Sequence, residues 1–369
     1  MRLEARSHIA FAVVLRTSAL AAVAVAAVAA LLVAAAGAPI ARTFGLMLTG
    51  AFGSVFALSE TLTRAIPLML TGLAATVAFK ARLFNIGAEG QLYAGAIAAV
   101  AVGGGAFALP VPMLFLTMLL AAIAAGGVML LGPALMKLYW GVDEVVSTLL
   151  LNFIVLLSVG ALLDGPMKDA AAMGWPQSVA LPSDLELSKL VAQTRVHTGL
   201  LWSVGAALAL WALLRYTTLG FDIRALGANA RAAAFAGVPV TRTMVAVALL
   251  SGGLAGLAGA IEVAGRTGYV TLDMSPGYGY TGIVIAMLAS LHPLAVVGAS
   301  VLVAGVLVGA DSMSRSIGVP SYLADVVVAS AMLAVLTAGM LVRYRLRFDG
   351  ASTVSGRGSP SPSPSPSQS

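Results

Sequence analysis

The chain has 369 residues, of which 60% are hydrophobic and only 10% are charged, and its formal net charge is +6. Soluble domains usually carry about 25% charged residues, so a chain this long with so few charges needs lipid around much of its surface. It contains no cysteine, which excludes disulfides, thiolate nucleophiles and cysteine-based metal sites. The positive excess indicates basic cytoplasmic loops rather than nucleic-acid binding.

Apolar runs long enough to cross a membrane recur along the chain. They lie at 13–36, 56–79, 112–131, 145–163, 198–215, 243–264 and 322–342. Three further runs are short or interrupted by glycine and proline, and they lie at 86–104, 279–290 and 294–310. The sequence therefore predicts an all-α polytopic bundle, with eight spans if the last two short runs are re-entrant and ten if they cross.

The distribution of arginine and lysine predicts the orientation of these spans. Basic residues gather at the N-terminus, after the second run, between 215 and 243, and after the last run, and such regions lie on the cytoplasmic side. We therefore expect both termini to be cytoplasmic. The expected organisation is a cytoplasmic N-terminus (1–12), a transmembrane domain (13–342) with an extracytoplasmic loop (164–197) and a cytoplasmic loop (216–242), and a disordered Ser/Pro tail (343–369).

The first polar motif opens the short run at 86–104. Asn85, Glu89 and Gln91 lie among glycines at the start of an otherwise apolar segment. A carboxylate at bilayer depth costs several kcal/mol unless it is paired or hydrated, so these side chains are predicted to line a solute pathway. The alternative is that Asn85 caps a helix and Glu89 sits favourably in its first turn.

A second motif begins the run at 145–163. Glu144, Thr148 and Asn152 recur every four residues and so share one helix face. A polar stripe on an apolar helix is typical of a solute path. Alternatively, Asp143 caps this helix, Glu144 stabilises its start, and Asn152 bonds a neighbouring helix.

Two later segments also break the apolar pattern. In 219–238, Arg224 and Arg231 are seven residues apart, which places them on one face of a short amphipathic helix that docks on a partner protein or lies at the lipid headgroups. Near 278–282, Tyr278 and Tyr280 alternate with glycines, as in a broken helix that lines a cavity or in an interfacial aromatic belt. The pairing of glycine-bearing spans with interrupted ones, at 72–95 and 256–282, is compatible with an inverted repeat; chance similarity between helices rich in glycine and alanine explains it equally well.

Chemistry-bearing motifs are missing from the sequence. It has no GxxxxGK[ST] phosphate loop, HExxH motif or nucleophile elbow. We therefore expect a transport protein rather than an enzyme, with no cofactor or metal on this chain. If transport is active, its energy must come from an ion gradient or from another subunit.

The order of four segments resembles the permease subunits of ATP-binding-cassette (ABC) importers of the simple-sugar and nucleoside type, which are related to branched-chain amino-acid permeases. The matching segments are 84–91, 141–152, 220–238 and 277–294. The resemblance covers roughly residues 55–342 and is nearest to the nucleoside branch. It departs from the family pattern at Ala230, where relatives often have proline, and at Ser290-Leu291-His292, which leaves the fine substrate specificity open.

This resemblance implies a heteromeric importer. Two permease chains, alike or related, would form the pathway in the lipid, an extracytoplasmic protein would deliver the solute, and separate ATPase subunits would use ATP and magnesium. No nucleic acid is expected as a partner. The coupling residues toward the ATPase would be Asp222, Arg224, Gly227, Asn229 and Arg231.

Two other classes of protein fit the composition. A self-sufficient, gradient-driven carrier or channel would use Glu89 and Glu144 as ion or proton sites. A membrane enzyme would need a nucleophile, a base or a metal cluster at the membrane interface, and the sequence indicates none. The exact solute, and whether the two permease chains are identical, stay open.

Overall fold

The computed structural model describes residues 39–317 except 106 and 108, together with 2–5, 344–347 and isolated positions within 23–37 and 326–337. Six helices in this part of the chain are long and apolar enough to cross a membrane. They are α3 (Val55–Lys80), α5 (Val111–Trp140), α6 (Glu144–Asp164), α7 (Gly199–Tyr216), α10 (Val240–Glu262) continued by the π-turn η2 (Val263–Thr267), and α12 (Pro293–Ile317). The predicted all-α membrane bundle is confirmed. The expected spans at 13–36 and 322–342 lie mostly outside the described residues.

Shorter elements connect and flank the long helices. They are α2 (Ile40–Phe52), α4 (Ala88–Gly103), the 3₁₀ turn η1 (Ser183–Leu185), α8 (Thr218–Ala228), α9 (Ala230–Phe235) and α11 (Tyr278–Leu288). The short runs expected near 86–104 and 279–290 correspond to α4 and α11. Each of these two helices follows a long one, α3 and α10 respectively.

Helices α3 and α10 form the centre of the bundle. Helix α10 packs on α3, α4 and α5, and α3 also packs on α11 and α12. Most of α3 and α10 is therefore buried, whereas only a minority of α6 and α7 is buried. Because the exposed side chains of α6 are largely apolar, among them Leu150, Phe153 and Leu157, this surface suits lipid or another apolar chain.

Glycines let the central helices approach one another closely. A Cβ atom on Gly95 of α4 would lie 2.2 Å from the backbone oxygen of Gly256 in α10, and one on Gly126 of α5 would lie 2.2 Å from the oxygen of Gly252. No side chain fits at such separations. The small residues therefore bring the backbones of α4, α5 and α10 into direct contact, which is the usual packing solution in lipid.

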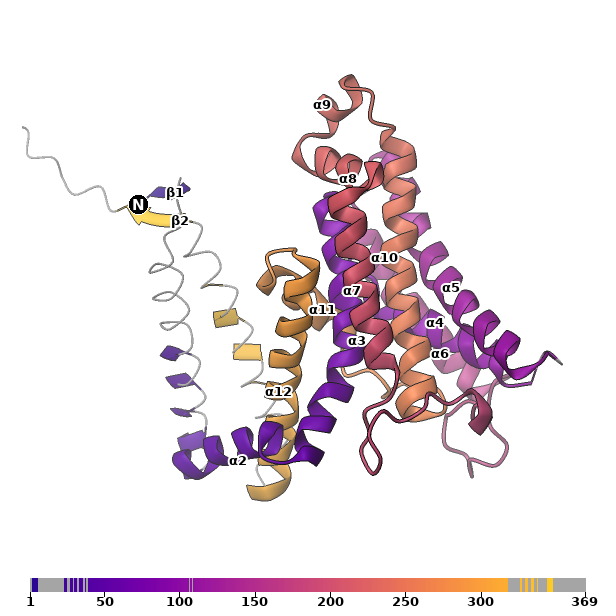
Figure 1. Cartoon of the computed structure of the whole chain (residues 1–369), viewed down its shortest axis with the longest axis vertical. Helices are drawn as coiled ribbons and strands as arrows, with labels where there is room; N and C mark the ends of the chain where they lie inside the picture. The colour runs from indigo at the N-terminus through magenta and orange to yellow at the C-terminus, as the bar shows by residue number, and fades with distance from the viewer. Residues whose placement is uncertain are drawn as a thin grey trace, which may run out of the picture.

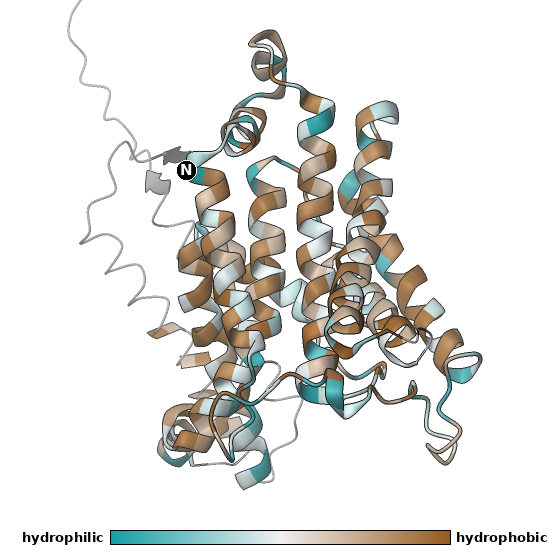
Figure 2. Cartoon of the chain, turned by 45° about the vertical axis from the view of Figure 1, so that its right-hand side comes forward, coloured by the Kyte–Doolittle hydropathy of each residue, from teal (hydrophilic) through white to brown (hydrophobic). Residues whose placement is uncertain are grey.

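The two long connections lie at opposite ends of the bundle, because α7 leads from one to the other. The connection 165–198 precedes α7, and α8 and α9 follow it directly; Figure 1 shows α8 and α9 projecting beyond one end of the bundle. In Figure 2 the long helices are mostly brown, and hydrophilic residues gather mainly near the two ends. The polarity pattern thus matches a membrane slab crossed by the helices.

The 165–198 connection is fastened to the bundle although it has little regular structure. Backbone hydrogen bonds join it to η2 and to the linker that follows, from Ser178 N–H to the Val270 oxygen (3.0 Å) and from Leu187 N–H to the Ala264 oxygen (2.8 Å). Leu181 and Leu185 are buried. This loop therefore packs on the bundle as a structured cover.

Two helices differ from expectation. Helix α2 was not predicted, because its 13 residues are too short for a spanning run; it packs on α12, where Phe52 lies against Gly305. The run at 294–310 was expected to be short or interrupted, and this was wrong. Helix α12 continues to Ile317, since Asp311, which ends the apolar run, is paired with Arg64 of α3.

The ends of the chain meet in a small sheet. Strand β1 (Arg2–Ala5) pairs with β2 (Tyr344–Arg347) in antiparallel register, with Glu4 opposite Arg345. The segment from 343 was expected to be disordered throughout, so β2 corrects this expectation for its four residues. The Ser/Pro repeats lie outside the described residues.

Candidate functional site: two short helices that begin inside the bundle

An unwound segment separates α3 from α4. Residues 83–86 have no regular structure, and α4 begins only at Ala88, yet Leu83 and Asn85 are buried. Backbone N–H and C=O groups that leave a helix inside a membrane protein need other partners.

The polar face of α6 supplies those partners. Glu144, Thr148 and Asn152 are buried in a row along α6, as their spacing predicted, and each accepts a hydrogen bond from the unwound segment or from the first turn of α4. The three donors are Phe84 N–H to Glu144 Oε1 (3.3 Å), Ile86 N–H to Thr148 Oγ1 (3.2 Å) and Gly90 N–H to Asn152 Oδ1 (2.8 Å). Asn152 Nδ2 also donates to the Ile86 oxygen (2.9 Å). The stripe thus replaces the missing helical hydrogen bonds.

The start of α6 follows the alternative interpretation of this motif. Asp143 is the N-cap residue, and its Oδ1 accepts from Val145 N–H (2.8 Å). Glu144 also receives a hydrogen bond from the ammonium of Lys137 at 2.5 Å, and the same ammonium donates to the Arg82 oxygen (2.7 Å). Lys137, which the sequence analysis missed, therefore ties the end of α5 to the start of both α6 and the unwound segment.

A pair of carboxamides holds the unwound segment against α10. Asn85 and Gln91 exchange two hydrogen bonds of 2.9 Å, and Asn85 Nδ2 also donates to Ser251 Oγ (3.1 Å), which in turn donates to the Ala74 oxygen (2.8 Å). The alternative interpretation, in which Asn85 caps α4, was wrong. The N-cap residue is Gly87, and Asn85 instead links three helices.

Glu89 joins the beginnings of the two short helices. It lies in the first turn of α4, is buried, and its Oε2 accepts from Gly279 N–H of α11 at 2.6 Å. A Cβ atom on Gly279 would lie 2.2 Å from the Glu89 nitrogen, so only glycine permits this contact. A carboxylate between two helix N-termini is stabilised by both helix dipoles, a compensation for its burial.

The two tyrosines of α11 take different positions. Tyr280 is 37% exposed, and its hydroxyl accepts from Asn152 Nδ2 (3.1 Å). Tyr278 is buried, and its carbonyl and hydroxyl oxygens accept from Thr71 (3.0 Å) and Arg266 (3.2 Å). The interfacial alternative is therefore wrong for Tyr278, which lies inside the protein.

All eight residues predicted for the pathway thus belong to one connected polar region. Their surroundings include charged residues that the sequence analysis did not select, namely Glu60, Arg64, Glu262, Arg266 and Asp311. These could have been found, because four of them lie in or beside the apolar runs at 56–79 and 243–264, where a charge is costly.

The predicted coupling residues lie in the connection that forms α8 and α9, beside the end of α3 from which the unwound segment leaves. The expected single helix is in fact two, because Asn229 interrupts it and caps α9 by accepting from Arg231 N–H (3.0 Å). Arg224 and Arg231 therefore do not share one helix face, contrary to expectation. Arg224 donates to the Leu214 oxygen at the end of α7.

The remaining coupling residues lie either where α8 packs on the bundle or on the exposed surface around α9. Gly227 lies against the Lys80 oxygen at the end of α3, Asp222 is half-buried, and Asn229 and Arg231 are exposed. The connection therefore rests on the ends of α3 and α7 and presents α9 to the outside.

The chemistry available in the buried region is binding rather than catalysis. Among the described residues no group of three His, Asp or Glu side chains could hold a metal ion. The amides, hydroxyls and the Glu89 carboxylate suit a polar, hydrogen-bonding solute.

Comparison with known proteins identifies the class to which this arrangement belongs. The family of permease components of branched-chain amino acid transport systems matches residues 57–336. A glucose ABC transporter permease of Haloferax volcanii is 36% identical over 313 residues, which are 82% of each chain. A guanosine ABC transporter permease of Bacillus subtilis is 34% identical over 315 residues, 85% of this chain and 88% of the relative. A nucleoside ABC transporter permease of Lactococcus lactis is 29% identical over 295 residues, 77% and 80% of the two chains.

Proposed function

Since this chain belongs to the family of branched-chain amino acid transport permeases and is a multi-pass permease subunit of an ABC transporter, we propose that it imports a nucleoside or a simple sugar. The observation that carries this proposal is the similarity, above 30% identity and over more than four fifths of each chain, to permeases named for glucose and guanosine. Both solutes are small, uncharged and rich in hydrogen-bonding groups. The buried amides and hydroxyls beside α4 and α11 have matching chemistry.

The proposed pathway runs along the contact between α4, α6 and α11. Tyr280 is its most accessible predicted member and bonds Asn152, so a solute in contact with its ring would be close to both short helices. Such aromatic groups pack against sugar rings and nucleobases alike. Glu89 and the carboxamide pair then act as positioning residues that keep the short helices in place.

The proposed orientation places both termini and the α8–α9 connection in the cytoplasm of a bacterial inner membrane. Strands β1 and β2 pair, so residues 2–5 and 344–347 lie on one side, and Figure 1 places both strands nearer the α8 end of the bundle than the α2 end. The excess of arginine in the 216–242 connection supports the cytoplasmic assignment.

The transporter class implies an ATPase partner, and the finer assembly is a proposal. We assign the exposed helix α9 and Arg231 to contact with the ATPase, a second permease chain to the exposed apolar face of α6, and an extracytoplasmic binding protein to the end that carries 165–198. ATP and magnesium would be used by the ATPase.

Reconstitution tests the proposed function. The full chain is placed in proteoliposomes with its ATPase and binding protein, and uptake of radiolabelled guanosine and of radiolabelled glucose is measured with and without ATP. We expect ATP-dependent uptake of one solute, with competition from unlabelled members of the same class. Equal uptake by the chain without ATPase would overturn the proposal, as would ATP-dependent uptake of neither solute.

A conservative variant tests the pathway separately. Tyr280→Phe keeps the ring and removes the hydroxyl that bonds Asn152, so we expect reduced uptake at unchanged expression. Tyr216→Phe, at an exposed tyrosine that is the last residue of α7, is the matched control. Uptake by Tyr280→Phe equal to that of the control would contradict a pathway beside α11.

A further inference from the structure

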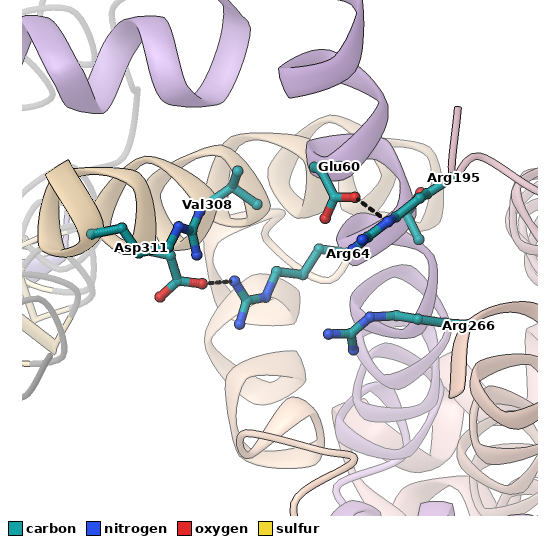
Figure 3. A pocket seen from close by; sticks show the side chains of 8 residues that line it. Glu60, Arg64, Arg195, Arg266, Val308 and Asp311 are labelled. Atoms are coloured by element: carbon teal, nitrogen blue, oxygen red, sulfur yellow. Dashed lines mark hydrogen bonds and ion pairs between the residues drawn. The ribbon is translucent and has the colours of Figure 1, made fainter. Parts of the chain in front are cut away.

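A cavity of about 180 Å³ lies at the end of the bundle that carries the 165–198 connection. Figure 3 shows the side chains around it, which come from α3, from that connection, from η2 and from α12. The lining residues are Glu60, Thr63, Arg64, Arg195, Arg266, Val308, Asp311 and Arg315. Charged groups dominate this set, which is unusual between membrane helices and marks a functional site.

The charges around the cavity do not balance. Three ion pairs are present: Arg195 with Glu60 (3.2 Å), Arg266 with Glu262 (2.5 Å), and Arg64 with Asp311. Within the described residues Arg315 has no ion pair, so four arginines face three carboxylates and one positive charge remains in excess. The cavity lining is therefore net positive, and such a lining attracts anions.

Two of the guanidinium groups approach the same space. Figure 3 shows Arg64 and Arg266 extending toward it from α3 and η2. The Nε atom of Arg64 is buried and has no hydrogen-bond partner in the described part of the chain, although a buried N–H donor normally has one. Arg64 therefore has donor capacity that its pairing with Asp311 does not use.

The geometry and charge favour an oxyanion as the missing partner. The planar guanidinium fork matches the oxygens of a phosphate group, and such charge-assisted bonds are the stronger kind. A water molecule takes about 30 Å³ of liquid volume, so the cavity has room for about six waters, or for a phosphate group with a small substituent. Nucleosides and simple sugars carry no charge, so this ligand class differs from the proposed solute.

We propose that this cavity binds a phosphate group, held by Arg64 and Arg266 and attracted by Arg315. The phosphate belongs either to a soluble phosphate compound or to a lipid headgroup. Arg266 also donates to the hydroxyl of Tyr278, the first residue of α11. Occupancy of the cavity therefore changes the interactions of a residue that holds the start of α11, next to the Glu89–Gly279 contact.

Thermal unfolding of the full-length chain in a neutral detergent tests the proposal. Inorganic phosphate is titrated at constant ionic strength with chloride as the balancing anion, and the midpoint is expected to rise in a saturable manner, because a ligand of the folded state stabilises it. In Arg64→Gln and Arg266→Gln the apparent Kd should increase at least about tenfold. Arg42→Gln, on an exposed residue of α2, should bind phosphate as the unaltered chain does.

A second titration separates the two sources of phosphate. Phosphatidylglycerol is added to the delipidated protein in place of inorganic phosphate. Stabilisation by the lipid alone, abolished by Arg64→Gln, assigns a lipid headgroup, whereas stabilisation by inorganic phosphate assigns a soluble ligand. Absence of a saturable response to either probe overturns the proposal, and so does a response that Arg64→Gln and Arg266→Gln leave unchanged.

Arg315→Gln keeps the test decisive if the buried variants do not fold. Arg315 is exposed at the end of α12 and has no ion pair among the described residues, so its replacement should leave the helix intact. We expect phosphate binding to weaken about threefold, because only a longer-range attraction is lost. Unchanged affinity in this variant would contradict the proposed role of the excess charge.

Discussion

The unwound segment between α3 and α4 and the connection between α7 and α10 both interrupt the long helices, but they solve the interruption differently. In the first, the freed backbone groups are buried and bonded by Glu144, Thr148 and Asn152. In the second, helices α8 and α9 satisfy their own backbone, α8 rests on the ends of α3 and α7, and α9 is largely exposed. The difference separates an interior that is fixed by its own contacts from an exposed helix, α9, for which we proposed contact with the ATPase.

The strongest test of the fixed interior is Gly279→Val. Its Cβ atom would collide with the Glu89 nitrogen, which the backbone cannot easily avoid, so we expect a loss of about 3 kcal/mol or failure to fold. The measurement is the thermal midpoint of the detergent-purified chain by size-exclusion chromatography. Gly298→Val, at an exposed position of α12 with open space around it, should change stability by less than about 0.5 kcal/mol. Equal effects of the two variants would refute the close approach of α4 and α11.

Asn152→Ala should have the next largest effect. It leaves Gly90 N–H and the Ile86 oxygen without partners, at a cost of about 1–3 kcal/mol. The same unfolding assay measures it, and uptake is expected to fall with stability. Ser158→Ala, on an exposed turn of the same helix, serves as control. If Asn152→Ala were as stable as this control, the α6 stripe would not be what holds the unwound segment.

The 165–198 connection is intermediate between the buried unwound segment and the exposed helix α9. The pKa of His197 reports how firmly this connection is packed. Burial lowers the pKa of His197 to about 4, below the ordinary value of about 6.5. Gly265 lies against the ring. Between about pH 6.5 and about pH 4, His197 is therefore protonated in the unfolded chain but not in the folded chain. The free energy of unfolding decreases as the pH falls through this range.

Between about pH 7 and pH 5.5 this loss should be about 1 kcal/mol. Thermal midpoints of the unaltered chain and of His197→Gln, taken across this range, give the measurement, and the variant should lack this part of the pH dependence. His292→Gln, at an exposed histidine, should retain it. Parallel curves for the unaltered chain and His197→Gln would mean that the connection is loosely packed.

Arg224→Glu should have the smallest effect on stability and a large one on assembly. Its side chain is exposed apart from its bond to the Leu214 oxygen, so we expect at most about 0.5 kcal/mol. Reversal of its charge should lower recovery of the ATPase on co-purification by about tenfold. Arg42→Glu, near the opposite end of the molecule, should not. A strong loss of stability without loss of ATPase would place Arg224 with the fixed interior instead.

Periodicity predicted which residues share a face, but it could not predict what that face meets. The four-residue spacing placed Glu144, Thr148 and Asn152 together correctly. Their hydrogen bonds to the backbone of residues 84–90 depend on where the chain leaves the helical conformation. Periodicity does not show that point, because a stretch rich in alanine could also continue as a helix. The same limit applies to Asn229. Asparagine is a good N-cap residue, but the seven-residue spacing of Arg224 and Arg231 favoured one continuous helix, so the break at Asn229 was not predicted.

Length and charge explain the other differences. Helix α2 has too few residues to be recognised as a membrane span. Helix α12 continues beyond its apolar run because Asp311 pairs with Arg64, which lies 247 positions away in the sequence. Pairings over such separations depend on tertiary packing and have no local signal. The charged residues around the cavity were visible individually, but only the folded chain brings them together.

The glycine contacts among α4, α5 and α10 have a mechanical consequence. Where backbones touch at Gly95, Gly126, Gly252 and Gly256, one helix cannot slide along another without driving a neighbouring side chain into the adjacent backbone. These three helices should therefore move as a single rigid body. Any rocking that exposes the solute alternately to the two sides of the membrane would then have its hinge or shear plane elsewhere, where side chains rather than backbones separate the helices.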